Sequence, residues 1–195
     1  MARSFLILHG YEGSGPEHWQ SWLAERLRRA GERVAYPGLP DPYAPAPHAW
    51  RAALATQLRT LRGELTVIAH SLACILWLQH CNAPVIGDAR AARVLLVAPP
   101  SLAGAPRPIR RFFPVALERE RVAAAAADTR LVCAPDDPYC PEDAAVVYGE
   151  PLGLAVDVLP GGGHINVETG YGPWPAAEDW CYGASAITSS RIAPG

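Results

Sequence analysis

The chain of 195 residues contains no lysine, and all 17 of its Lys and Arg positions are arginine. A lysine nucleophile, a Schiff-base lysine and a phosphate-loop lysine are therefore excluded. Long hydrophobic runs are also absent, and no stretch reaches the roughly 18 apolar residues that a membrane span needs. The apolar run from Phe5 to Leu8 is too short for the core of a signal peptide. We expect no contact with a membrane.

Charge is sparse and nearly balanced. Only 18% of the residues are charged, the formal net charge is −2 and the isoelectric point is near 6.3. Such a balance predicts no general attraction to nucleic acid or to an anionic membrane surface. Hydrophobic residues make up 50% of the chain, which excludes a disordered or fibrous protein. The length predicts a single domain over residues 1–195, with the residues after Arg191 frayed.

Cysteine is present in an odd number, five, and without zinc spacing. This usage favours a reduced, cytoplasmic compartment over a disulfide framework. The histidines likewise show no metal-ligand spacing, so we expect no metal site.

A repeated unit organises the rest of the chain, in which six short apolar runs alternate with segments of helical periodicity. Each run is rich in Val, Leu and Ile and is bounded by Pro, Gly or polar residues, as is typical of buried parallel strands. The predicted strands are Ser4–Leu8, Arg33–Tyr36, Leu65–Ala69, Arg93–Ala98, Arg130–Ala134 and Ala155–Leu159. The predicted helices are Glu17–Ala30, Pro47–Arg62, Leu72–Cys81, Ala123–Ala127, Glu142–Tyr148 and Pro175 to about Ser189.

This alternation predicts an α/β fold: a three-layer α/β/α sandwich around a six-stranded, mainly parallel sheet. The longest connection runs from Pro99 to Asp128, about thirty residues. That length leaves no room for a cap domain, so we expect a shallow site covered by loops.

Active-site residues of such sheets gather where the strands end. The third strand ends in Ala69-His70-Ser71-Leu72-Ala73, a strand, turn and buried helix that predict a nucleophile elbow at Ser71. Alanine stands at both outer positions, where glycine is usual, and a simple helix-capping role for Ser71 is the alternative. The backbone N–H groups of Leu72 and of Tyr11, in the loop after the first strand, are the expected oxyanion donors.

The partners that a serine nucleophile needs follow at two further strand ends. Asp136 and Asp137 come after the fifth strand, and His164 comes after the sixth within Gly163-His164-Ile165-Asn166. The order Ser, Asp, His along the chain is that of α/β-hydrolases. We favour Asp137 as the residue that orients His164, and expect Asp136 to form loop hydrogen bonds.

Several motifs together resemble the small α/β-hydrolase family of retinoblastoma-binding protein 9 and bacterial YdeN. They are His9-Gly10, Gly13-Ser14, His18-Trp19, Ala69 to Leu72, Asp136 to Pro138, Gly163 to Asn166 and Gly170-Tyr171-Gly172-Pro173-Trp174-Pro175. The resemblance implies a minimal serine hydrolase fold without a cofactor. It also implies Ser71 as nucleophile, Asp137 as orienting acid and His164 as base. Ala73 departs from the family pattern, which usually has glycine there.

The human relative is linked to pocket proteins through an L-x-C-x-E motif. Here Leu131-Val132-Cys133-Ala134-Pro135 has proline where glutamate is needed, so we expect no such partner. We expect His70 to be a packed residue, and His18 and Trp19 to hold the oxyanion loop. The predicted substrate-lining residues are Phe112, Phe113, Tyr139 and Trp174.

These patterns predict a serine hydrolase that cleaves a small-molecule carboxylic ester with a small or exposed acyl group, through a Ser-His-Asp triad and an acyl-enzyme. A peptidase or amidase with the same three residues is the alternative enzyme. A catalytically silent binding module is the alternative of another class, and the alanines at positions 69 and 73 are its only support.

Overall fold

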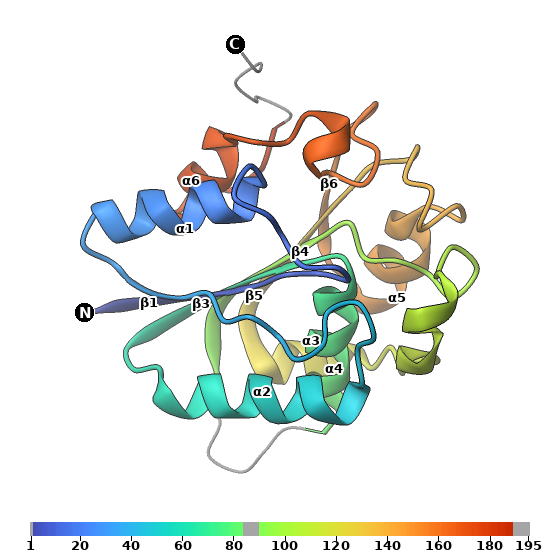
Figure 1. The fold of residues 1–195 in the computed structure, drawn as a ribbon, viewed down its shortest axis with the longest axis horizontal. Coiled ribbons are helices and arrows are strands. Elements are labelled where there is room, and N and C mark those ends of the chain that lie inside the picture. Colours follow the sequence, from blue (N-terminus) through green and yellow to red (C-terminus); the bar gives the residue numbers. More distant parts are fainter. Residues whose placement is uncertain (1, 84–89, 189–195) are drawn as a thin grey trace.

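The computed structural model describes residues 2–83 and 90–188, which form one six-stranded sheet between two layers of helices (Figure 1). The strand order is β2-β1-β3-β4-β5-β6, and every neighbouring pair is parallel. The strands are β1 (Arg3–Leu8), β2 (Arg33–Ala35), β3 (Glu64–His70), β4 (Ala91–Val97), β5 (Ala126–Cys133) and β6 (Ala155–Val158). The predicted fold class is confirmed.

Helices cover both faces of the sheet. Helices α1 (Trp19–Arg29) and α6 (Pro175–Cys181) lie side by side on one face, and the others cover the opposite face (Figure 1). These others are α2 (Pro47–Thr60), α3 (Leu72–Asn82), α4 (Arg119–Ala125) and α5 (Glu150–Leu152). The strands have no polar alternation because both of their faces are buried: in β3, all residues from Leu65 to His70 are buried.

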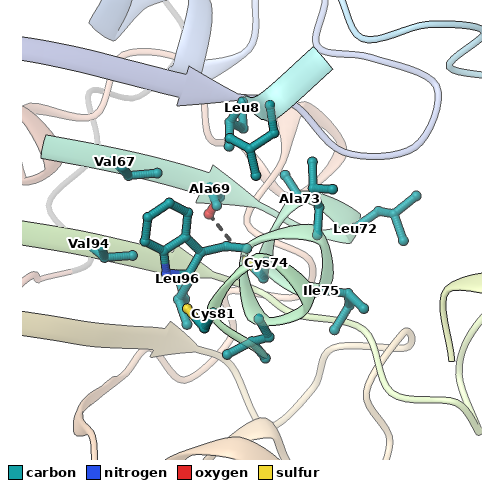
Figure 2. Close-up of a cluster of buried hydrophobic side chains, with 14 of the residues drawn as sticks. Leu8, Val67, Ala69, Leu72, Ala73, Cys74, Ile75, Cys81, Val94 and Leu96 are labelled. Carbon is teal, nitrogen blue, oxygen red and sulfur yellow. Dashed lines mark hydrogen bonds between the residues drawn. The ribbon is translucent and has the colours of Figure 1, made fainter. Parts of the chain in front are cut away.

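Helix α3 is the centre of the larger core. From Leu72 to Leu78 every side chain is buried, and Figure 2 shows the helix enclosed by apolar residues of β1, β3 and β4. A helix that is apolar on all sides has no amphipathic stripe, which is why its sequence predicted a deeply buried element. Its first residue follows Ser71 directly, so the core fixes where the end of β3 points.

Three predicted helix boundaries were wrong. Residues Ala126 and Ala127 belong to β5, since Ala126 pairs with Ala91 of β4. The prediction failed because a run of identical alanines shows no periodicity that distinguishes a helix from a strand. The helix expected over Glu142–Tyr148 begins later, as a π-helical turn, η2 (Ala145–Gly149), that runs into α5. Helix α6 ends at Cys181, before Gly183 turns the backbone to a φ of +111°. The frayed tail predicted after Arg191 lies outside the described residues.

The connection between β4 and α4, which the structure describes throughout, holds one short 3-10 helix, η1 (Arg107–Phe112). No further domain is inserted between these two elements. The carboxyl ends of the strands are therefore covered only by loops, as the length of this connection predicted.

Candidate active site

Ser71 lies at the sharp turn between β3 and α3. Its φ of 54° and ψ of −124° are unusual for a residue with a side chain, and its backbone N–H donates to the carbonyl of Val97 at 2.9 Å. Such a strained conformation persists only where the surrounding structure holds it, and it is the conformation of a nucleophile elbow. The Ser71 side chain makes no capping hydrogen bond to α3, which contradicts the helix-capping alternative.

Close backbone approach at this turn comes from Gly10, which the sequence placed in the His9-Gly10 motif without a role at the elbow. A Cβ atom on Gly10 would lie 2.7 Å from Ser71 Cβ and 3.1 Å from its Oγ. Ala69 and Ala73, by contrast, are buried in the core and their methyl groups are accommodated there. Gly10, in the loop after β1, thus makes the close approach that requires a glycine. Alanine at positions 69 and 73 is compatible with the elbow.

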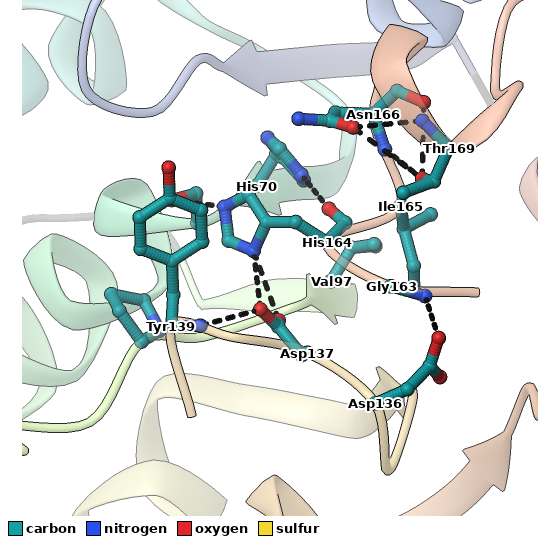
Figure 3. A network of polar contacts seen from close by, with 12 residues as sticks. His70, Val97, Asp136, Asp137, Tyr139, Gly163, His164, Ile165, Asn166 and Thr169 are labelled. Carbon is teal, nitrogen blue, oxygen red and sulfur yellow. Dashed lines mark hydrogen bonds and ion pairs between the residues drawn. The ribbon is translucent and has the colours of Figure 1, made fainter. Parts of the chain in front are cut away.

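Three side chains from three strand ends form one hydrogen-bonded chain, and Figure 3 shows its His164 and Asp137 part. His164 Nε2 lies 2.9 Å from Ser71 Oγ, and His164 Nδ1 lies 2.9 and 3.0 Å from the two carboxylate oxygens of Asp137. Because a carboxylate only accepts, Nδ1 carries the proton and Nε2 is left to accept from the serine hydroxyl. All three residues are at least nine-tenths buried.

Both adjacent aspartates act on the His164 loop, in different ways (Figure 3). Asp137 also accepts from the backbone N–H of Tyr139 at 2.9 Å, so its carboxylate is held in place. Asp136 accepts from the backbone N–H of Gly163 at 3.1 Å, the residue before His164. The predicted loop hydrogen bond of Asp136 is confirmed.

Three other histidines surround this chain and are held uncharged. Burial lowers the pKa of His9 below its usual value. Burial, followed by the nearby imidazole of His164, lowers the pKa of His18 to about 3. Burial, followed by His18 and His164, lowers the pKa of His70 well below its usual range, and His70 Nε2 donates to the backbone carbonyl of His164 at 3.0 Å. His70 is packed, as predicted, and it supports the His164 backbone.

The side chains of His18 and Trp19 bond at the start of α1 and on the His164 loop, and their expected hold on the oxyanion loop stays a prediction. His18 caps α1, accepting from the backbone N–H of Gln20 at 3.2 Å. The indole of Trp19 donates to the carbonyl of Ile165 at 2.9 Å, which ties the start of α1 to the residue after His164.

Ser71 and His164 open into a pocket of about 260 Å³. Its walls come from four loops, at residues 11–18, 106–109, 139 and 164–168. Tyr139 lines the pocket as predicted, with its ring centroid 4.3 Å from that of His164. Pro106, Ile109, Asn166, Val167 and Glu168 also line the pocket, although the sequence did not assign these residues to the substrate.

The three other predicted lining residues were wrong. Phe112 is fully buried and packs edge-on against Trp50, and Phe113 packs against the same core. Trp174 is fully buried between Trp19 and Tyr171. Large aromatic side chains gain most by leaving water, so burial in the core competes with a place in an open pocket.

Within the described part of the chain, no three histidines, cysteines or acidic residues are grouped so that they could hold a metal ion. Helices long and apolar enough to cross a bilayer are not found among the same residues either.

With this geometry in view, comparison with known proteins identifies the family. The serine hydrolase family model matches residues 5–182. The chain belongs to the serine hydrolase family. It is therefore a hydrolase, and the resemblance predicted from its motifs is confirmed.

The relatives share the fold over nearly the whole chain. YdeN of Bacillus subtilis (strain 168) is 23% identical over 183 residues, which are 92% of this chain and 94% of YdeN. The crystal structure of the B. subtilis ydeN gene product superposes with a TM-score of 0.79 at 21% identity, covering 93% of this chain and 97% of that one. Est1E from Butyrivibrio proteoclasticus has a TM-score of 0.61 at 13% identity, covering 93% and 87%. At these identities the structural likeness shows the fold alone.

Proposed function

We propose that this serine hydrolase cleaves carboxylic esters through a Ser71–His164–Asp137 triad and an acyl-enzyme. One observation carries the proposal: His164 lies within hydrogen-bond distance of a strained serine on one side and of a buried carboxylate on the other. Nucleophile, base and orienting acid are the groups that acyl transfer to a serine requires. Since the chain has no lysine, His164 is the base available to Ser71.

Each residue has a defined step in the proposed reaction. The Ser71 hydroxyl passes its proton to His164 Nε2 while Ser71 Oγ attacks the ester carbonyl. His164 then gives that proton to the leaving alcohol as the C–O bond breaks, and the acyl group remains on Ser71. Water, deprotonated by His164, attacks the acyl-enzyme, and the acid leaves as Ser71 regains its proton. Asp137 keeps His164 in the required tautomer and stabilises its charged form.

Two backbone N–H groups are available for the oxyanion. Leu72 is the first residue of α3, so its N–H has no partner within the helix. Tyr11 lies in the loop that brings Gly10 against Ser71. In the part of the chain that the structure describes, neither N–H donates to another carbonyl. We propose that both donate to the oxyanion of the tetrahedral intermediate.

A fluorophosphonate probe tests this proposal, because it labels only an activated serine. We expect the folded wild-type chain to be labelled and Ser71→Ala to be unlabelled and inactive. Ser14→Ala is the matched control, since Ser14 lines the same pocket but bonds to Gln20 rather than to a base, and should keep its labelling. No labelling of well-folded wild type would overturn the proposal and favour a silent binding module.

The ester assignment is tested separately from the triad. We expect p-nitrophenyl acetate to be turned over faster than an aminoacyl amide of similar size. Turnover of the amide alone by the labelled enzyme would replace the esterase with a peptidase or amidase that uses the same residues.

A further inference from the structure

A second, mostly apolar groove of about 330 Å³ adjoins the Ser71 pocket. It is lined by Pro16, Glu17, Trp22, Val167, Gly170, Gly172 and Pro173. Val167 lines both the groove and the pocket, and its side chain is 45% exposed. Val167 therefore stands at the boundary that the groove and the Ser71 pocket share.

Hydrogen bonds tie the walls of the groove to the His164 loop. The two segments that wall it, residues 16–22 and 167–173, also continue into the walls of the Ser71 pocket. They are joined by the backbone hydrogen bond from Trp19 N–H to Tyr171 O, at 3.2 Å, and by the indole of Trp19 on Ile165 O. A molecule that reaches from the pocket past Val167 therefore meets a preformed surface.

The segment Gly170 to Pro175 has a structural explanation in this groove. Tyr171 and Trp174 point into the core, where both are fully buried. Their neighbours in the segment, Gly170, Gly172 and Pro173, remain partly exposed, are small or compact, and form the groove wall. The large side chains thus anchor the segment, and the small ones leave the space open.

The mechanism indicates which end of an ester meets the groove. His164 must protonate the leaving oxygen, so the alcohol part of the substrate lies beside the His164 loop. Val167 is on that loop, three residues after His164. We propose, on the basis of the esterase activity proposed above, that the groove binds an apolar alcohol moiety of the substrate. The substrate class is then esters of small acyl groups with longer, uncharged alcohols.

Alkyl acetates of increasing alcohol length, from ethyl to hexyl acetate, test this inference by proton release at constant pH. Burial of one methylene group is worth about 0.8 kcal/mol, so we expect kcat/KM to rise up to about fourfold for each added methylene. A series with constant alcohol and growing acyl chain, from ethyl acetate to ethyl hexanoate, should show no such rise.

Val167→Ser should flatten the alcohol series, so that kcat/KM relative to that for ethyl acetate no longer rises with alcohol length, and Val167→Ala should be intermediate. Val158→Ser is the matched control: Val158 is 47% exposed, on β6 and outside the groove, and its variant should keep the wild-type slope. If Val167 had only a structural role, its replacement would lower kcat/KM equally for all substrates and would lower the melting temperature.

The outcomes separate the two proposals. Wild type that hydrolyses ethyl acetate without any dependence on alcohol length overturns the groove and leaves the esterase proposal standing. If kcat/KM rises with the length of the acyl chain and Val167→Ser removes that rise, the groove binds the acyl group. That result would overturn the alcohol assignment. No hydrolysis of any ester would instead count against the proposed function.

Discussion

The floor of the Ser71 pocket and its rim are built in opposite ways. On the floor, Ser71, Asp137 and His164 are buried and joined by hydrogen bonds of 2.9 to 3.0 Å. On the rim, Glu12 and Glu168 are exposed, and among the described residues neither carboxylate forms an ion pair.

The difference shows which part of the pocket is organised before substrate arrives. Floor groups have fixed positions and tautomers, so they need no rearrangement when charge develops on a reacting oxygen. Rim carboxylates are exposed and outside any described ion pair, so we expect changes there to alter substrate fit rather than the reaction itself. Substitutions on the floor should therefore lower the activity far more than substitutions on the rim.

The largest effect is expected at Asp137. Asp137→Asn removes the charge that holds His164 in the correct tautomer and should lower kcat by about 10⁴-fold with the fold intact. Steady-state kinetics on p-nitrophenyl acetate measure it. Asp136→Asn is the matched neighbour: its amide oxygen still accepts from Gly163, so activity should stay close to wild type. Equal losses in both variants would show that the two carboxylates share one role.

Gly10→Ala tests the closeness of the floor to the loop after β1. The new Cβ, 2.7 Å from Ser71 Cβ, must displace one of the two segments, and we expect kcat/KM to fall by about 10²-fold. Gly15→Ala serves as the control, because a Cβ there has no heavy atom within 4 Å and Gly15 has no positive φ. A Gly10→Ala enzyme of normal activity would contradict the close approach.

The buried histidines next to the floor should make stability depend on pH. His18 has a pKa of about 3 in the folded chain against 6.5 as its ordinary value, so below pH 6.5 the unfolded chain binds a proton that the folded chain does not. Its contribution to stability is present above pH 6.5 and is lost as the pH falls toward 3. From pH 6.5 to 5 the loss is about 2 kcal/mol.

Denaturant unfolding at several pH values measures this loss. His18→Asn keeps a good helix cap but has no titrating ring, so its stability should decline less between pH 6.5 and 5. The control is His48→Asn, which replaces an exposed histidine and should preserve the wild-type decline. An unchanged decline in His18→Asn would mean that other groups cause it.

The smallest effect is expected on the rim. Glu168→Gln removes an exposed charge that no described residue pairs, so kcat/KM for a neutral ester should change by less than about twofold. A loss of tenfold or more in the same assay would show that the rim takes part in the chemistry, and the contrast between the two regions would fail.

The sequence was sufficient to predict those elements whose conformation depends on neighbouring residues alone. The buried strands could be predicted because apolar runs between Pro and Gly have few other stable conformations. The turn at Ser71 could be predicted because a strand, a small polar residue and an apolar helix follow one another directly. The boundary at Ala126 could not, because only its pairing with Ala91 makes that alanine a strand residue.

The sequence by itself determined the parallel α/β sheet, the family and the three residues that strand ends bring together, since each depends on patterns a few residues long. Tertiary structure alone decided that Phe112 and Trp174 enter the core and that Gly10 lies against Ser71. It also decided that an apolar groove adjoins the pocket at Val167. These features depend on contacts between segments far apart, such as the bond between Trp19 and Ile165, 146 residues along the chain. The competition among such contacts for burial is settled only when the whole chain packs.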